Sequence, residues 1–144
     1  MKILARILAM SALFVAFVSC DSSDDNNMNT TTFTASLNGA KEVPPNISDA
    51  TGNATLVYNE NTNKFDLTVT YSGVTATDAH IHKGAVGTSG SVVFPITVTA
   101  SPLTLNDVSL TAEQEADLKN GLYYVNIHSA AYPNGEIRGQ LTEE

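Results

Sequence analysis

The sequence contains only one cysteine, Cys20, among its 144 residues. A disulfide within the chain is therefore impossible, and the fold has to be stabilised by core packing or by a bound metal. Basic residues are also scarce: seven lysines and arginines stand against fifteen aspartates and glutamates, for a formal net charge of −8. Because the basic residues after the N-terminal segment are scattered and form no patch, nucleic acid is not an expected partner. They are Lys41, Lys64, Lys83, Lys119 and Arg138.

An apolar run long enough to span a membrane is missing as well. Near the start, two basic residues are followed by a shorter apolar stretch through residues 13–18 and by the small residue Ser19, which is the order of a signal peptide. Residues 17–20, Phe-Val-Ser-Cys, resemble a bacterial lipobox, in which a lipid is attached to the cysteine and the chain is cut just before it. We expect residues 1–19 to be a lipoprotein signal peptide and Cys20 to be lipidated. The alternative is an ordinary signal peptide followed by an unmodified cysteine.

Residues 20–31 are polar, acidic and without periodicity, which predicts a flexible tether. An acidic cluster after a lipidated cysteine resembles the surface-export signal of Bacteroidetes lipoproteins, whereas in other bacteria an aspartate directly after it can mean retention in the inner membrane. The sequence thus predicts a protein of the cell envelope that a lipid anchors to a membrane, at the outer membrane or the cell surface.

From residue 32 onward, short alternating runs are separated by glycine, proline, asparagine and aspartate. The clearest run is 64–71, in which Phe65, Leu67 and Val69 face one way and the polar residues between them face the other, as in a half-buried antiparallel strand. Residues 102–107 are expected to be a loop. Further strands are expected at residues 32–37, 52–58, 78–82, 91–96, 122–128 and 136–142.

One short helix is expected at residues 111–120. Thr111 and Gln114 fit a capping box at its start, and Gly121 stands where a C-terminal glycine belongs. Seven or eight short strands with one small helix indicate an all-β fold, an antiparallel β-sandwich or a Greek-key barrel.

The chain has only three histidines, and their placement is the one pattern that indicates chemistry. His80 and His82 lie two residues apart in an expected strand and therefore share one of its faces, while His128 lies in another expected strand. Three neutral imidazoles suit copper or zinc and can leave one coordination position open. The alternative is that all three are ordinary polar strand residues without a metal.

Neighbouring polar residues are candidates for supporting roles. Asp78 and Asn126 are the nearest residues in sequence that can orient the histidine rings through their second nitrogens. Glu136 and Arg138, in the last expected strand, are expected to form an ion pair that fixes that strand.

Several ordered blocks of the sequence resemble the CHRD domain, a family named for chordin, the extracellular antagonist of bone morphogenetic proteins. The blocks are residues 33–39, 42–45, 79–84, 92–94, 110–111, 121–128 and 132–141, with Gly87 and Gly90 between them. On this resemblance residues 32–142 are identified as a CHRD domain, whose fold is expected to be an immunoglobulin-like sandwich similar to copper/zinc superoxide dismutase. The resemblance implies little about function.

The dismutase likeness also concerns the histidines. His80 and His82 are similar to that enzyme's paired copper ligands, His128 is similar to a later one, and Arg138 is loosely similar to its substrate-guiding arginine. The chain lacks a histidine to bridge two metals, a zinc cluster and a cysteine pair, so dismutation is not expected.

Three classes of function remain. The first is a metal-binding extracytoplasmic module, and the second is a metal-free surface module for binding or adhesion to a protein or glycan partner. An enzyme ranks last, because no nucleophile–base pair, paired carboxylates or cofactor motif is present.

Overall fold

A computed structural model of the chain describes residues 29–144, and these residues form an almost entirely β structure. The predicted signal peptide, Cys20 and most of the predicted tether lie outside the described residues. No helix in the described part is long and apolar enough to cross a membrane. The strands are β1 (Thr30–Asn38), β2 (Thr51–Asn59), β3 (Lys64–Ser72), β4 (Ala76–Lys83), β5 (Ser91–Ile96), β6 (Leu103–Ser109), β7 (Tyr123–Ser129), β8 (Ile137–Gln140) and β9 (Thr142–Glu143); the helices are the 3₁₀ turn η1 (Gly39–Lys41) and α1 (Ala112–Lys119).

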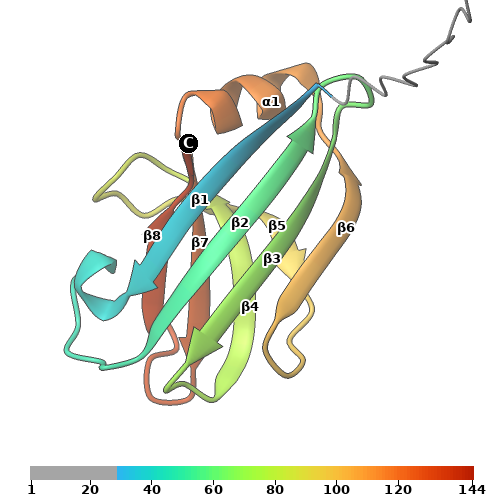
Figure 1. Cartoon of the computed structure of the whole chain (residues 1–144). Helices are drawn as coiled ribbons and strands as arrows, with labels where there is room; N and C mark the ends of the chain where they lie inside the picture. Colours follow the sequence, from blue (N-terminus) through green and yellow to red (C-terminus); the bar gives the residue numbers. More distant parts are fainter. Residues whose placement is uncertain (1–28) are drawn as a thin grey trace, which may run out of the picture.

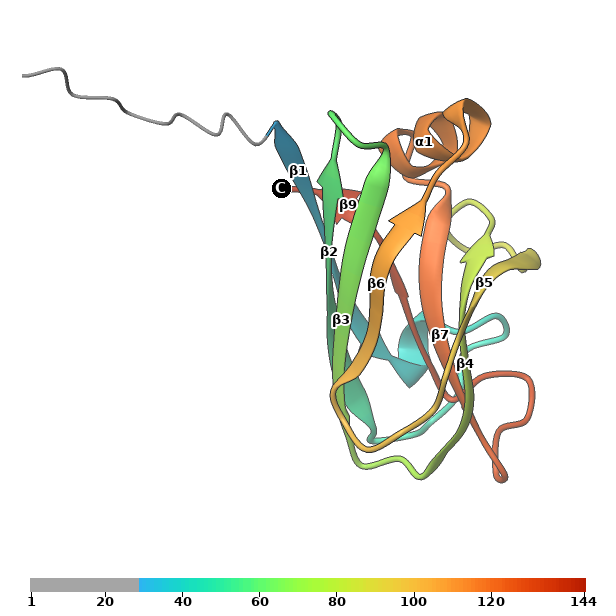
Figure 2. The same cartoon turned by 90° about the vertical axis from the view of Figure 1, so that its right-hand side faces the viewer.

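The strands form one antiparallel sheet in the order β5-β4-β7-β8-β1-β2-β3-β6, with β9 paired to β1. The sheet curls back on itself, so that β2, β3 and β6 in one layer face β4, β5 and β7 in the other (Figures 1 and 2). Helix α1 lies at one end of the two layers. The predicted antiparallel sandwich or barrel is confirmed.

The core lies between the two layers and follows the predicted alternation. In β3, Phe65, Leu67 and Val69 are buried while Asp66 and Thr68 are exposed. Within the described residues, the core forms one cluster whose members all lie between residues 33 and 141.

The helix begins at the predicted capping box. The Gln114 backbone N–H donates to Thr111 Oγ1 at 3.2 Å, and the Thr111 N–H donates to Gln114 Oε1 at 2.9 Å. Gly121 follows the helix with a φ of 66°, a backbone conformation that glycine adopts without strain. Leu118 is the one buried residue of α1, so this side chain attaches the helix to the core.

The prediction of a loop at residues 102–107 is wrong, because most of this segment belongs to β6, which pairs with β3. The register shifts between Phe65 and Leu67, where Asp107 has a φ of 57° and its N–H donates to Asp66 Oδ1. This bulge accommodates turn-forming residues inside a strand. Two strand ends also differ from expectation: β1 begins at Thr30, and the last expected strand is divided into β8 and β9.

Candidate metal centre

The three histidines lie on the outer face of the sheet, on the neighbouring strands β4 and β7. In β4, Ala79 and Ile81 point into the core and are fully buried, so His80 and His82 project from the opposite face. In the antiparallel register of β4 and β7, His128 is paired with Asp78, two positions before His80 and on the same face of the strand. That offset places His128 diagonally across from His80.

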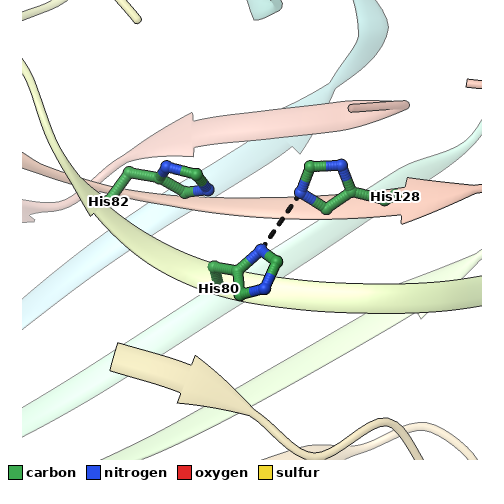
Figure 3. Close-up of side chains that lie close together, drawn as sticks. All are labelled: His80, His82 and His128. Carbon is green, nitrogen blue, oxygen red and sulfur yellow. Dashed lines mark hydrogen bonds between the residues drawn. The ribbon is translucent and has the colours of Figure 1, made fainter. Parts of the chain in front are cut away.

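The three side chains converge (Figure 3). The strand pattern predicted only that His80 and His82 share a face. His80 Nδ1 lies 3.2 Å from His128 Nε2. One nitrogen from each of the three rings lies within 4.8 Å of the other two. The ring centroids of His80 are 5.3 Å from His82 and 5.1 Å from His128.

The second nitrogen of each ring faces an oxygen that orients it. His82 Nδ1 lies 3.0 Å from the Gly90 carbonyl oxygen, and His128 Nδ1 lies 2.9 Å from the Pro133 carbonyl oxygen. His80 Nε2 lies 3.1 Å from Asp78 Oδ1. Because these oxygens are acceptors, we assign a proton to each facing nitrogen. The lone pairs then belong to His80 Nδ1, His82 Nε2 and His128 Nε2, the nitrogens that converge.

Hydrogen bonds within the described residues do not satisfy the three converging lone pairs. His82 Nε2 is buried and has no hydrogen-bond partner in residues 29–144, a state that costs about 1–3 kcal/mol for a buried polar atom. In the assigned tautomers, His80 Nδ1 and His128 Nε2 present lone pairs to each other at 3.2 Å. A cation between the rings would satisfy all three nitrogens.

The pKa values of His80 and His82 favour the neutral, ligating form. Burial lowers the pKa of His80, an effect that the Asp78 carboxylate partly opposes. Burial also lowers the pKa of His82, against the hydrogen bond to Gly90, and the neighbouring histidines and Arg138 lower it further. Because a protonated imidazole cannot ligate, both shifts keep these residues available to a metal near neutral pH.

An aromatic residue and a glycine loop cover the site on the His82 side. The Tyr124 ring stacks on His82, with centroids 4.9 Å apart and planes at 5°. The Gly90 N–H donates to Tyr124 Oη at 3.0 Å, and the Gly90 carbonyl oxygen faces His82 Nδ1. The backbone of Gly90 therefore positions both side chains. A Cβ atom at Gly90 would lie 1.6 Å from the Lys83 carbonyl oxygen. The close approach of the chain at this position therefore requires glycine.

The supporting residues predicted from the sequence have different roles in the structure. Asp78 contacts His80, as described. Asn126 is paired with His80 in the strand register but hydrogen-bonds elsewhere: its Nδ2 donates to Glu42 Oε1 at 2.7 Å, and its Oδ1 is buried without a partner in the described residues. It does not orient a histidine ring through a hydrogen bond.

The expected ion pair between Glu136 and Arg138 is wrong. Glu136 Oε1 accepts a hydrogen bond from Ser48 Oγ at 2.6 Å. Arg138 stacks over the Tyr124 ring, with Cζ 3.4 Å from the centroid, and donates from Nη2 to the Ala85 carbonyl oxygen. Each side chain has a nearer partner on another segment of the fold, and no ion pair within residues 29–144 joins the two.

Sequence reasoning missed three groups at this site. The carbonyls of Gly90 and Pro133 orient two histidines, and Glu42 is buried beside Asn126, where burial raises its pKa to about 7. The glycine loop after the His80–His82 strand and the turn at residues 133–135 were the available signals. Neither signal specifies which backbone oxygen faces a ring.

Comparison with known proteins identifies a family. The model of the CHRD domain matches residues 33–141, about three quarters of the chain. No curated protein and no solved structure is significantly similar to the chain.

Proposed function

The chain belongs to the CHRD domain family, and from this premise we propose that it is an envelope protein that binds copper or zinc through His80, His82 and His128. The observation that supports metal binding is the convergence of three lone-pair nitrogens whose partner nitrogens all face oxygens. Oxygen partners of this kind are typical of metal-ligating histidines, because they fix the tautomer and the ring orientation.

The spacing of the nitrogens suits a small transition-metal ion. Zn–N bonds of about 2.0–2.1 Å in a tetrahedral arrangement place two ligand nitrogens about 3.3 Å apart. The distance of 3.2 Å between His80 Nδ1 and His128 Nε2 is close to this value, and the His82 nitrogen lies within 4.8 Å. Three neutral imidazoles suit both metals, and a bound ion would retain an open position for a further ligand.

We also propose that a lipid on Cys20 anchors the protein to a membrane of the cell envelope, at the outer membrane or the cell surface. The support comes from the sequence alone: the basic and apolar start, the small Ser19 and the single cysteine at the expected cleavage boundary. The segment after Cys20 would lead to β1, which begins at Thr30.

The simplest test is the metal content of protein that has been purified without a histidine tag. Copper or zinc at about one equivalent per chain supports the proposal. Protein that contains no metal and takes none up would instead support the second candidate, a metal-free surface module for binding or adhesion to a protein or glycan.

A further inference from the structure

Two of the five basic side chains within residues 29–144, Lys41 and Arg138, form no ion pair with a carboxylate. The other three are paired at N–O distances of 2.6–2.8 Å. These pairs are Lys64 with Asp107, Lys83 with Asp117 and Lys119 with Glu115. Lys41 and Arg138 line the same cavity, of about 340 Å³. In a chain with a formal net charge of −8, two cations that form no ion pair therefore meet at one cavity.

Arg138 is the deeper of the two cations. It is 2% exposed, and its guanidinium has one hydrogen bond within the described residues, from Nη2 to the Ala85 carbonyl oxygen at 3.3 Å. Stacking on Tyr124 covers one face of the guanidinium without neutralising it. A buried cation without a paired anion is costly, so the site favours a negative group.

Nearby acidic groups do not fully supply that negative charge. Glu136 is engaged with Ser48. Glu42 is close enough for the charge of Arg138 to act on it, but burial outweighs that effect and raises the pKa of Glu42 to about 7. Near neutral pH its carboxyl group is therefore only partly ionised.

The remaining walls of the cavity suit an oxyanion. Lys41 Nζ donates to the Ser36 carbonyl oxygen, which holds the ammonium group at the cavity. Thr34 and Ser36 add hydroxyl groups to the lining, and hydroxyl groups can donate to anion oxygens. Thr142 also lines the cavity, but its Oγ1 donates to the Thr34 carbonyl oxygen at 3.5 Å. Val86 and Gly87, from the loop that follows β4, also line the cavity.

We propose that this cavity binds an oxyanion, the carboxylate or phosphate group of a small ligand, through the Arg138 guanidinium and the Lys41 ammonium. The planar fork of an arginine matches the paired oxygens of both groups. The volume is at the lower end of the roughly 300–1,000 Å³ of typical ligand pockets. It suits a small acid, either an inorganic ion or an acidic sugar.

The cavity is distinct from the proposed metal centre. The Tyr124 ring contacts Arg138 and also stacks on His82, and none of the three histidines lines the cavity. Anion binding can therefore be measured without metal, and the two proposals can fail independently.

The test uses untagged protein of residues 28–144, which include every member of the core cluster described above. Metal is first removed with a chelator, and the chelator is removed by gel filtration. Inorganic phosphate, glucuronate and neutral glucose are titrated by calorimetry at constant ionic strength. We expect saturable binding of at least one anion and none of glucose. Binding of both anions assigns the site to simple oxyanions, and binding of glucuronate alone assigns it to acidic sugars.

Variants locate the binding. Lys41→Met and Arg138→Gln should each weaken anion binding by about tenfold or more, the value of one charge-assisted hydrogen bond. Lys64→Met removes a paired cation elsewhere and should change nothing. If Arg138→Gln fails to fold, the Lys41→Met variant still tests the proposal, because Lys41 is exposed. The proposal is overturned if neither anion binds, if glucose binds equally well, or if Lys41→Met binds like the parent or no worse than Lys64→Met.

Discussion

His80 Nδ1 and His128 Nε2 lie 3.2 Å apart, although the two residues are 48 positions apart in the sequence. Their other nitrogens face Asp78 and the Pro133 carbonyl oxygen. In the assigned tautomers the contact is a hydrogen bond only if one ring carries a second proton, and burial opposes that proton by lowering the pKa of His80. A shared cation would resolve the conflict between the two lone pairs.

Replacement of Asp78 by asparagine should weaken metal binding by about tenfold, the lower value found for partners of metal-ligating histidines. The amide can still accept a hydrogen bond but carries no charge to favour the His80 tautomer. Because the Asp78 side chain is 60% exposed, folding stability should change little. Metal titration of Asp78→Asn is compared with Asp49→Asn, an exposed carboxylate on another segment. Equal affinities in the two variants would argue against the role of Asp78.

Replacement of Gly90 by alanine should weaken metal binding and lower stability, because the added Cβ would lie 1.6 Å from the Lys83 carbonyl oxygen. The loop has to shift, and the shift breaks the hydrogen bonds to His82 and Tyr124. Gly87→Asn is the control: no atom lies within 4 Å of a Cβ there, and asparagine tolerates the positive φ of 76°. Metal titration and urea unfolding measure both effects. Wild-type behaviour of Gly90→Ala would show that the loop does not hold the site.

Replacement of Glu42 by glutamine should remove a pH dependence of stability. Burial raises the pKa of Glu42 from 4.5 to about 7, so the folded protein binds a proton that the unfolded chain has released between these values. The unfolding free energy should therefore fall as pH rises from about 4.5 to 7. The neutral Glu42→Gln keeps an acceptor for Asn126 and should be more stable than the parent by about 1–3 kcal/mol at pH 8.

Urea unfolding at several pH values tests this prediction, with Glu144→Gln, at the exposed C-terminus, as the control. The control should follow the parent at every pH. A Glu42→Gln protein that is less stable than the parent at pH 8 would show that Glu42 acts as an ionised partner of Arg138.

Replacement of Cys20 by serine should release the protein from the membrane fraction of its native host, because serine cannot take the lipid. One acyl chain alone binds a membrane only weakly, so stable anchoring requires the full lipoprotein modification. Fractionation and immunoblotting of the full chain measure the effect. Ser22→Ala, two residues away, is the control and should stay with the membrane. Membrane association of Cys20→Ser equal to that of the parent would contradict lipidation.

Side-chain periodicity made much of the fold and part of the histidine cluster predictable. The alternation of Phe65, Leu67 and Val69 identified β3, and the spacing of His80 and His82 placed both on one face. The strand register, which sequence spacing does not determine, decides that His128 lies diagonally across from His80 and that Arg138 reaches Tyr124. Strand β6 was not predicted because of the bulge at Asp107. Aspartate is typical of turns, and only the pairing with β3 shows that this one lies within a strand.

The orienting carbonyls were beyond sequence reasoning for a different reason. Every residue has a carbonyl oxygen, so nothing in the side chains of Gly90 or Pro133 marks them as partners of His82 and His128. Only the path of the two loops in space brings these oxygens to the rings.

Titration of untagged protein of residues 28–144 with copper and zinc, near neutral pH, tests metal binding by the three histidines most directly. We predict one site per chain, bound more tightly than about micromolar. His82→Ala and His128→Ala should each lose most of the affinity because two ligands remain, whereas Asp49→Asn should bind like the parent. A parent that binds neither metal more tightly than about micromolar, or single histidine variants that bind as well as the parent, would contradict a shared metal site.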